Sequence, residues 1–382
     1  MLQRLAIILV LFSVVWCHSQ TLSPDAEISV LTIGPGDNLN DAFGHSAFRV
    51  KDQTHRIDLV YGYGEYDFDT PNFYLKFAQG KLEYQMSKHN FYDIYRFYTH
   101  HDRTIEEQVL NLSQDEKEKL FRLLTENYKP ENRKYRYDFF FDNCATRIRD
   151  VLQQAVEDSM VFVGPKDFKA KTFRSLIYDH TGKNNWGSFG IDLALGSVID
   201  KTATPYEHMF LPKYIHAFFA TAKLGNRDLV KSSSVIYNRK NKANSGYFVF
   251  TPFVVFGILS IIIVYCTYCD YKRGKRSRLL DAIMFGLTGL IGTIIALLWF
   301  ATDHTATALN YNVLWAFPLN LLALAQVLRS QQKPWFRKYI KFLIILLALM
   351  ALHWLFGMQI FALSLLPLVF ALTVRYIYLA RN

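Results

Sequence analysis

Long hydrophobic runs fill the part of the chain after residue 246. They lie at residues 247–268, 279–301, 311–328, 339–356 and 359–379. Each run is close to the roughly twenty residues that an α-helix needs to cross a bilayer, although the third and fourth are somewhat short. The pattern therefore predicts an all-α bundle of about five transmembrane helices across residues 247–382.

Shorter hydrophobic stretches predict strands in the first half of the chain. Brief runs rich in β-branched and aromatic residues, broken by Gly, Pro, Asn and Asp, are typical of strands. Such runs lie at residues 28–33, 44–50 and 56–61, and a further strand is expected near residues 81–86. Residues 51–55 separate the second run from the third, so we expect these two strands to form a hairpin.

Helical patterns follow from residue 104 onward. Ser113 and Glu116 form a capping box, which predicts a helix running to about residue 126. Asp142 and Asn143 provide cap residues for another helix, expected from Cys144 to about residue 156. Residues 166–222 look helical with loops, and residues 223–245 look like a polar linker. Residues 20–246 are thus expected to form one α+β domain.

The first nineteen residues have the features of a secretory signal. Arg4 precedes an apolar run over residues 5–16, which is too short to span a bilayer comfortably. We therefore predict a signal peptide over residues 1–19, with an uncleaved anchor as the alternative. Lipid attachment at Cys17 is a further alternative, which bulky Trp16 disfavours.

The positive charge of the chain gives the orientation of the bundle. Of the net charge of +10, much lies in two segments between hydrophobic runs, at residues 272–278 and 329–341. The loop at residues 302–310 has no Lys or Arg. Cytoplasmic loops of membrane proteins are enriched in these residues. We therefore expect a multi-pass protein of a bacterial inner membrane with residues 20–246 in the periplasm. This distribution also argues against a nucleic-acid partner.

Cysteine usage directs attention to Cys144. Once a signal peptide is removed, Cys144 is the only cysteine in residues 20–246, so it has no partner there for a disulfide in an oxidising compartment. Such a thiol is either buried and inert or functional. The start of a helix lowers the pKa of a thiol, and Arg147 and Arg149 add positive charge. These features predict a thiolate nucleophile.

A nucleophilic cysteine needs a base, and His45 is the favoured candidate among eight histidines of this domain. It lies at the start of an expected strand after a Gly-rich loop, although a histidine in this position can also be a structural hydrogen-bonding group. A hairpin turn about Asp52 and Gln53 would place His45 opposite Val60. Asp58 would then lie diagonally on the same face, either as a group that orients the imidazole or as a solvated strand residue.

The order of these residues resembles the permuted papain-like arrangement of lecithin:retinol acyltransferase relatives. Several segments are more closely similar to the periplasmic domain of the membrane-bound bacterial lipoprotein N-acyltransferase family. The matching segments are residues 43–49, 58–64, 67–68, 72–74, 77, 80, 84, 108–112, 137–138 and 142–150, the last reading Asp-Asn-Cys-Ala-Thr-Arg-Ile-Arg-Asp. One departure is Gly62, at a position where the family pattern leads us to expect Asn.

The resemblance implies a cysteine acyl-enzyme built on Cys144 and His45. Its implied acyl donor is a phospholipid, and its implied acceptor is the N-terminal amine of a diacylated lipoprotein. Further substrate-binding candidates are Asn143, Arg147, His304 and His353, the two histidines having interfacial packing as the alternative. Cys266 and Cys269 are expected to stay unpaired, and we expect neither a metal nor a cofactor.

Two other functions are compatible with the same residues. A cysteine amidase or peptidase acting on cell-wall peptides would use a similar fold and would resolve its acyl-enzyme with water. A non-catalytic membrane assembly factor would carry Cys144 as a structural residue. Replacement of Cys144 separates the assembly factor from both enzymes, because only the assembly factor should keep its function.

Overall fold

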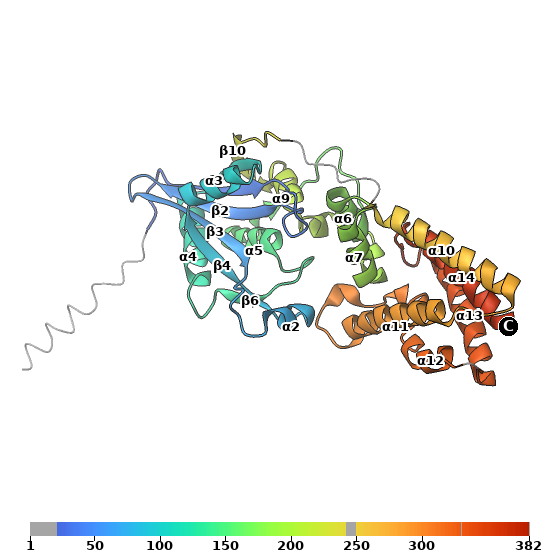
Figure 1. The fold of residues 1–382 in the computed structure, drawn as a ribbon. Coiled ribbons are helices and arrows are strands. Elements are labelled where there is room, and N and C mark those ends of the chain that lie inside the picture. The colour runs from blue at the N-terminus through green and yellow to red at the C-terminus, as the bar shows by residue number, and fades with distance from the viewer. Residues whose placement is uncertain (1–20, 242–249, 330, 382) are drawn as a thin grey trace, which may run out of the picture.

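The structure is a computed structural model that describes residues 21–241, 250–329 and 331–381. The predicted signal peptide lies outside the described residues. Figure 1 shows two parts side by side, an α+β domain (the N-terminal domain, residues 21–241) and a helical bundle over residues 250–381. This confirms the predicted order of an α+β domain followed by a helical region.

A seven-stranded antiparallel sheet forms the centre of the N-terminal domain, with the strand order β10-β5-β1-β2-β3-β4-β6. The first four strands correspond to the four predicted strand regions. The bounds are β1 Glu27–Ile33, β2 His45–Asp52, β3 Ile57–Glu65, β4 Glu83–Asn90, β5 Ile105–Leu110, β6 Lys134–Arg136 and β10 Val230–Tyr237. A second, three-stranded sheet contains β7 Met160–Val161, β8 Lys223–Leu224 and β9 Arg227–Asp228.

Helices cover both faces of the large sheet. The alternation of side chains along each strand gives one face Val30 and Phe48, which pack with α4 (Gln114–Asn127), α5 (Cys144–Val156) and α9 (Pro212–Phe219). The other face carries Leu31 and Ala47 under α3 (Phe91–His100). The remaining elements of this domain are α2 Phe73–Ala78, η1 Glu157–Ser159, α6 Phe173–Thr181, α7 Trp186–Ala194, η2 Ser197–Asp200 and α8 Pro205–His208.

The segment predicted as a polar linker, residues 223–245, instead contains three strands over its described part. Strand β10 pairs with β5 along its length, although its residues from Lys231 to Val235 are exposed. The exposed serines at the centre of this edge strand interrupt the run of β-branched and aromatic residues on which the strand predictions relied. Backbone hydrogen bonds to β5 define it instead.

Three helices of the described bundle are long and apolar enough to cross a membrane: α10 Pro252–Arg273, α11 Arg278–Phe300 and α13 Pro334–Leu355. The third predicted run does not form one helix, because Pro318 separates the short η5 (Tyr311–Leu314) from α12 (Asn320–Val327). The last run forms α14 (Leu365–Arg381), and η4 (Thr305–Thr307) lies in the loop after α11.

The two ends of the bundle differ in charge and contacts. Arg276, from the first basic segment, donates to the backbone oxygens of Val327 and Arg329 beside the second, at 2.7 and 3.2 Å. Both basic segments therefore lie at the same end. The loop between α11 and η5 lies at the other end, where Thr305 donates to Asp138 of the N-terminal domain at 2.9 Å. This agrees with the orientation expected from the charge pattern.

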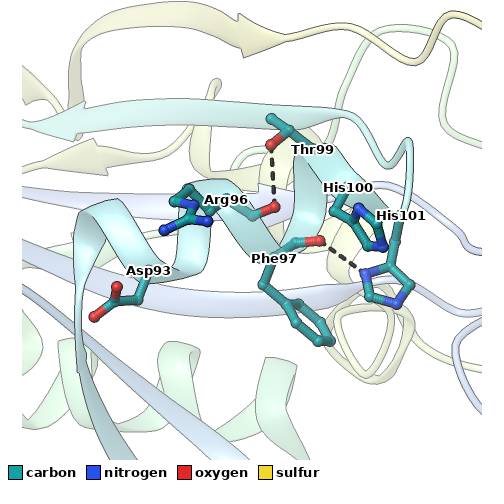
Figure 2. A pocket seen from close by; sticks show the side chains of 6 residues that line it. All are labelled: Asp93, Arg96, Phe97, Thr99, His100 and His101. Atoms are coloured by element: carbon teal, nitrogen blue, oxygen red, sulfur yellow. Dashed lines mark hydrogen bonds between the residues drawn. The ribbon is translucent and has the colours of Figure 1, made fainter.

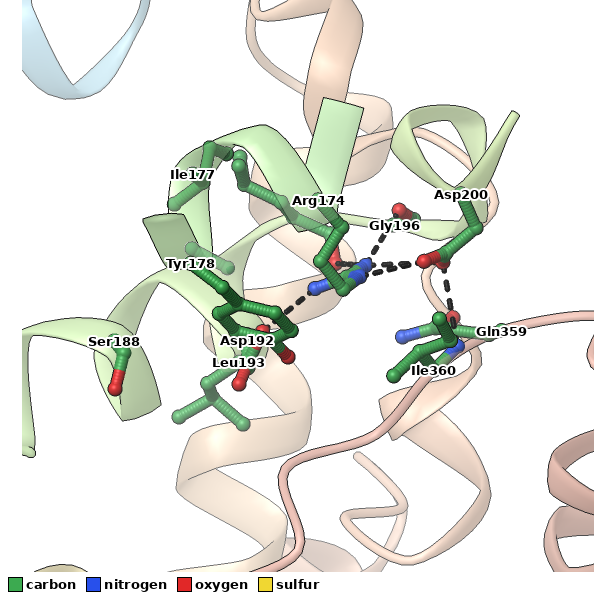
Figure 3. Close-up of polar contacts among 12 residues, drawn as sticks. Arg174, Ile177, Tyr178, Ser188, Asp192, Leu193, Gly196, Asp200, Gln359 and Ile360 are labelled. Carbon is green, nitrogen blue, oxygen red and sulfur yellow. Dashed lines mark hydrogen bonds and ion pairs between the residues drawn. The ribbon is translucent and has the colours of Figure 1, made fainter. Parts of the chain in front are cut away.

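A buried polar cluster joins the two parts, and we call it the domain joint (Figure 3). At its centre Arg174 of α6 contacts Asp192 at 2.8 Å and Asp200 at 2.7 Å, and donates to the Gly196 carbonyl at 3.0 Å. Asp200 also accepts from the backbone N–H of Ile360 in the bundle. A Cβ on Gly196 would lie only 1.9 Å from the Ala308 oxygen, so no other residue fits there without displacing the bundle loop.

Candidate active site

Cys144 is the first residue of α5 because Asn143 caps that helix. The Asn143 Oδ1 atom accepts from the N–H groups of Ala145 and Thr146 at 2.8 and 2.9 Å, and Thr146 Oγ1 accepts from the Asn143 N–H. The predicted helix and its cap are therefore confirmed. The Asn143 Nδ2 atom donates to the carbonyls of Phe139 and Phe210. Asn143 thus positions Cys144 through the cap, and the substrate contact predicted for it stays a prediction.

The thiol of Cys144 is buried beside several N–H groups. Burial raises the pKa of the Cys144 thiol above its usual value. The backbone N–H groups of Ser46, Ala145 and Cys144 itself, together with the Arg103 guanidinium, lower it but do not offset the burial. The predicted net lowering is therefore wrong, because the prediction counted the helix terminus and not the loss of water.

His45 directly precedes Ser46 on β2, so its backbone adjoins the N–H group that lies near the thiol. The His45 Nε2 atom lies 3.3 Å from the point where a Cβ on Gly62 would stand, and Ser87 Oγ lies 3.1 Å from the same point. Burial lowers the pKa of His45 to about 4, helped by Arg103 and opposed by Glu65. At neutral pH the site therefore holds a neutral imidazole and a protonated thiol.

Two glycines of β3 leave space for these side chains, one beside His45 and one beside Cys144. Gly62 lies beside the His45 ring, as above, so an Asn at this position would compete with the imidazole for space. Gly64 has φ +97°, and a Cβ there would lie 3.8 Å from Cys144 Cβ and 3.4 Å from the Tyr137 ring. Gly62 stands where the family pattern leads us to expect Asn. Its lack of a side chain lets the His45 ring pack directly on β3.

Two further polar groups face the site, and no sequence signal pointed to them. Among the described residues, the hydroxyl of Tyr135 is buried without a hydrogen-bond partner. It lies 3.9 Å from the Cβ point of Gly64. Burial raises the pKa of Tyr135, and the nearby Cys144 adds to the rise, so this phenol stays a neutral donor.

Arg103 is the second group. The residue is 6% exposed, and its Nε atom donates to the Gly34 carbonyl at 2.9 Å. The Nη1 atom lies 3.9 Å from Asp41, and Nη2 has no hydrogen-bond partner among the described residues. Because Arg103 lowers the pKa of both His45 and Cys144, its charge acts on the two groups together.

Asp58 does not lie where the sequence suggested. Strand β2 pairs with β3 in a register that places Arg49, not His45, opposite Val60. Asp58 accepts from Arg49 Nε and Nη2 at 2.7 and 2.8 Å. It lies four residues, or about 13 Å, along β3 from Gly62. The predicted orientation of His45 by Asp58 is therefore wrong; Ser87 lies near the imidazole, and the charges of Arg103 and Glu65 act on it.

The other predicted contact residues have partners within the protein. Arg147 forms a two-pronged ion pair with Asp142, and its guanidinium lies 4.2 Å from the centre of the Tyr135 ring. His304 Nε2 lies 3.0 Å from the Phe77 carbonyl oxygen of α2. His353 bonds its own helix through the Leu349 carbonyl. Of these side chains, Arg147 is the one that supports the site directly, through Tyr135.

One surface hollow of about 570 Å³ contains two more of the candidate histidines but not the thiol (Figure 2). It is lined by one end of α3, where His101 Nδ1 lies 2.8 Å from the Phe97 carbonyl oxygen. His100 lines the same hollow. Neither histidine contributes to the site around Cys144. The described residues contain no group of three or more His, Cys, Asp or Glu side chains arranged to hold a metal ion.

The fold and the site together define a class of protein. A cysteine at a capped helix start lies in an α+β domain, and that domain is hydrogen-bonded to a bundle with candidate membrane-spanning helices. The molecule is thus a membrane protein with its candidate site outside the bilayer.

Family models identify the class more closely. Residues 14–177 match the Lnb N-terminal periplasmic domain, and residues 242–382 match the Lnb transmembrane domain. The chain belongs to the Lnb family, which confirms the resemblance to membrane-bound lipoprotein N-acyltransferases seen in the sequence. It is a lipoprotein-processing membrane protein whose N-terminal domain is periplasmic. No curated protein and no solved structure matches the chain significantly.

Proposed function

We propose that the protein transfers an acyl chain from a phospholipid to the N-terminal amine of diacylated lipoproteins through a thioester on Cys144. The observation that carries this proposal is the position of Cys144 at the capped start of α5, with the Ser46 N–H near its sulfur and His45 next to Ser46. The acyltransferase activity accords with membership of the Lnb family.

In the first step, the Cys144 sulfur attacks the ester carbonyl of the phospholipid while the neutral His45 imidazole takes the thiol proton. The negative charge on the carbonyl oxygen is stabilised by the Cys144 N–H, which no neighbouring cap group occupies, and by Arg103 and Tyr135. Collapse of this intermediate breaks the ester C–O bond. The departing lysophospholipid oxygen takes the proton from His45, and the acyl group remains on sulfur.

In the second step, a neutral lipoprotein amine attacks the thioester. His45 accepts a proton from the nitrogen and returns it to the sulfur as the C–S bond breaks, so an amide and a free thiol result. The Cys144 side chain is 9% exposed, which limits access of water to the thioester. Burial therefore favours transfer to an amine held in the site over hydrolysis.

The proposal also covers the fold of the N-terminal domain, the membrane in which the protein lies and the number of membrane passes. The N-terminal domain is assigned a permuted papain-like arrangement because a strand histidine precedes a helix-start cysteine. The protein is placed in a bacterial inner membrane. Besides the three candidate spans, α14 and the η5–α12 segment complete the proposed five passes; the 17 residues of α14 extend about 25 Å.

Trapping of the covalent intermediate tests the mechanism. The full chain in detergent, incubated with phospholipid alone, should gain the mass of one acyl chain, and neutral hydroxylamine should remove it. A diacylated lipopeptide with a free N-terminal amine should discharge the acyl group into an amide. Cys144→Ala should abolish both reactions, whereas Cys266→Ala, which removes a free cysteine of α10, should leave them intact.

Each alternative function has its own result. An amidase or peptidase would acquire a peptidyl fragment without phospholipid. An assembly factor would keep its function in Cys144→Ala. Normal production of triacylated lipopeptide by Cys144→Ala would rule out the mechanism proposed here.

A further inference from the structure

Helix α2 exposes an unusual concentration of large apolar side chains. None of its six residues is buried, and Tyr74, Leu75 and Phe77 are 79%, 57% and 53% exposed. Phe68, just before the helix, is 66% exposed. We call these four residues the α2 surface. Contiguous apolar surface of this kind marks an interaction site in most proteins.

The α2 surface lies at the outer end of the bundle (Figure 1). The N–H of Asp303 donates to the Gln79 carbonyl at 2.9 Å, and His304 Nε2 lies 3.0 Å from the Phe77 carbonyl oxygen. Both bundle residues follow directly on α11, which ends at the 76% exposed Phe300. These hydrogen bonds hold α2 at the level where a membrane-spanning helix leaves the bilayer.

A series of aromatic rings leads from α2 toward the thiol. The ring centres of Phe73 and Tyr66 are 5.7 Å apart, and those of Tyr66 and Tyr84 are 5.3 Å apart. Tyr84 stacks on Tyr137 at 4.4 Å. The Tyr137 ring and Cys144 Cβ lie 3.4 and 3.8 Å from the same Cβ point of Gly64. The rings thus form a continuous aromatic row between the α2 surface and Cys144.

We propose that the α2 surface rests in the outer leaflet and that the aromatic row guides an acyl chain of the lipid donor from the bilayer to Cys144. The occupant is membrane lipid, because α2 is hydrogen-bonded to the loop directly after α11, a helix long and apolar enough to cross a membrane. Aromatic side chains at this depth suit the boundary between headgroups and acyl chains. The second half of the proposal, delivery to the thiol, rests on the proposed acyltransferase function.

Photo-crosslinking tests the contact with lipid independently of activity. A benzophenone amino acid at position 74 of the full chain, reconstituted in phospholipid vesicles, should crosslink to lipid. The same group at Tyr92, which is 65% exposed on α3, should not. Helix α3 lies on the side of the N-terminal domain away from α2 (Figure 1). Equal crosslinking at both positions, or none at position 74, would overturn the membrane contact even if the protein proves to be an acyltransferase.

A comparison of two phospholipid donors tests whether the α2 surface helps to deliver the acyl chain to Cys144. Phe77→Ser should lower thioester formation from vesicle phospholipid about tenfold, and it should change the reaction with a monomeric short-chain phospholipid by less than about twofold. Phe97→Ser on α3 is the matched control, since Phe97 is 54% exposed, and it should leave both reactions unchanged. A similar loss with both donors, or no loss with vesicles, would overturn delivery through α2. A wild-type chain that forms no thioester with either donor would contradict both delivery and the proposed function, while the crosslinking result would still stand.

Discussion

Arg103 and Arg174 are both buried in the N-terminal domain, yet their nitrogens are bonded to very different extents. Arg174 is fully buried, and Nε, Nη1 and Nη2 all donate, to Asp200, Asp192 and the Gly196 carbonyl. Arg103 is 6% exposed and uses Nε on the Gly34 carbonyl, whereas Nη2 has no hydrogen-bond partner among the described residues.

This difference separates a structural arginine from one that belongs to a site. A buried cation whose donors are all used can only hold the fold together. A buried donor without a partner costs free energy in the folded protein, and it is retained where a ligand or a reaction intermediate supplies the missing acceptor. The charge of Arg103 lowers the pKa of both Cys144 and His45, so it acts where negative charge develops in the proposed reaction.

The largest effect should come from His45, the proposed general base. His45→Ala should lower the rate of thioester formation by about two to four orders of magnitude, the range for a lost general base, with little change in thermal stability. His101→Ala, which removes a histidine of α3, should leave the rate unchanged. A rate for His45→Ala within tenfold of wild type would remove the imidazole from the mechanism.

The next-largest effect is a loss of stability at the domain joint. Arg174→Met should destabilise the protein by about 3–5 kcal/mol, because it leaves the Asp192 and Asp200 carboxylates without their cation. Thermal unfolding in detergent measures this loss. Arg239→Met breaks an ion pair with the 62% exposed Asp37 side chain and should cost less than about 1 kcal/mol. Equal stability of the two variants would contradict the structural role given to Arg174.

Arg103→Gln should lower the reaction rate strongly and the stability only slightly, the opposite of Arg174→Met. Loss of one charge-assisted hydrogen bond in the transition state predicts a rate about 10 to 100 times lower. The loss of stability should stay at about 1–2 kcal/mol, since the bond to the Gly34 carbonyl disappears together with the long 3.9 Å contact with Asp41 and the contact with the Tyr98 ring. Arg96→Gln on α3 is the control. If Arg103→Gln unfolds as easily as Arg174→Met while keeping its rate, the contrast between the two arginines fails.

The pH dependence of the reaction sharpens the description of the site. Burial lowers the pKa of His45 to about 4, and only the neutral imidazole accepts the thiol proton. The acid limb of kcat/KM should therefore lie near pH 4 and not near 6.5. Because the unfolded chain binds this proton more readily, the contribution of His45 to stability is complete above pH 6.5 and is lost as the pH falls toward 4. An acid limb near 6.5 would show that the imidazole is solvated.

The smallest effect is expected at Asp58. Because Asp58 binds Arg49 and lies about 13 Å along β3 from Gly62, Asp58→Asn should change the rate by less than about twofold. Ser87→Ala, next to His45, should lower the rate by a larger factor. A larger loss in Asp58→Asn than in Ser87→Ala would restore the role that the sequence suggested for Asp58.

Local signals made α5 and its cap predictable. Asn143 and Thr146 interact within one helical turn, so the position of Cys144 at the helix start depends on neighbouring residues alone. The same holds for α4, whose Ser113 and Glu116 form the expected capping box. His45 was placed on the right strand for a similar reason, since β2 follows from a local run of strand-forming residues bounded by turn residues.

Features that depend on distant residues were not predictable. The β2–β3 register differs from the expected one because β2 continues through Asp52, whose buried carboxylate accepts from Ser23, 29 residues earlier, and from the His55 N–H. This contact moves the turn beyond Asp52. Arg103 and Tyr135 reach the site only through the packing of the whole domain, so no spacing in the sequence relates them to Cys144.

The packing of α7 has a practical consequence for how the protein can be handled. Phe189 and Trp186 of this helix stack against Phe256 of α10, with ring centres 5.0 and 5.8 Å apart, and Leu193 packs against the core of the bundle. A fragment ending before α10 would leave these side chains in water and would be prone to aggregate. Purification of the folded N-terminal domain therefore requires the whole chain, held in detergent or a lipid nanodisc.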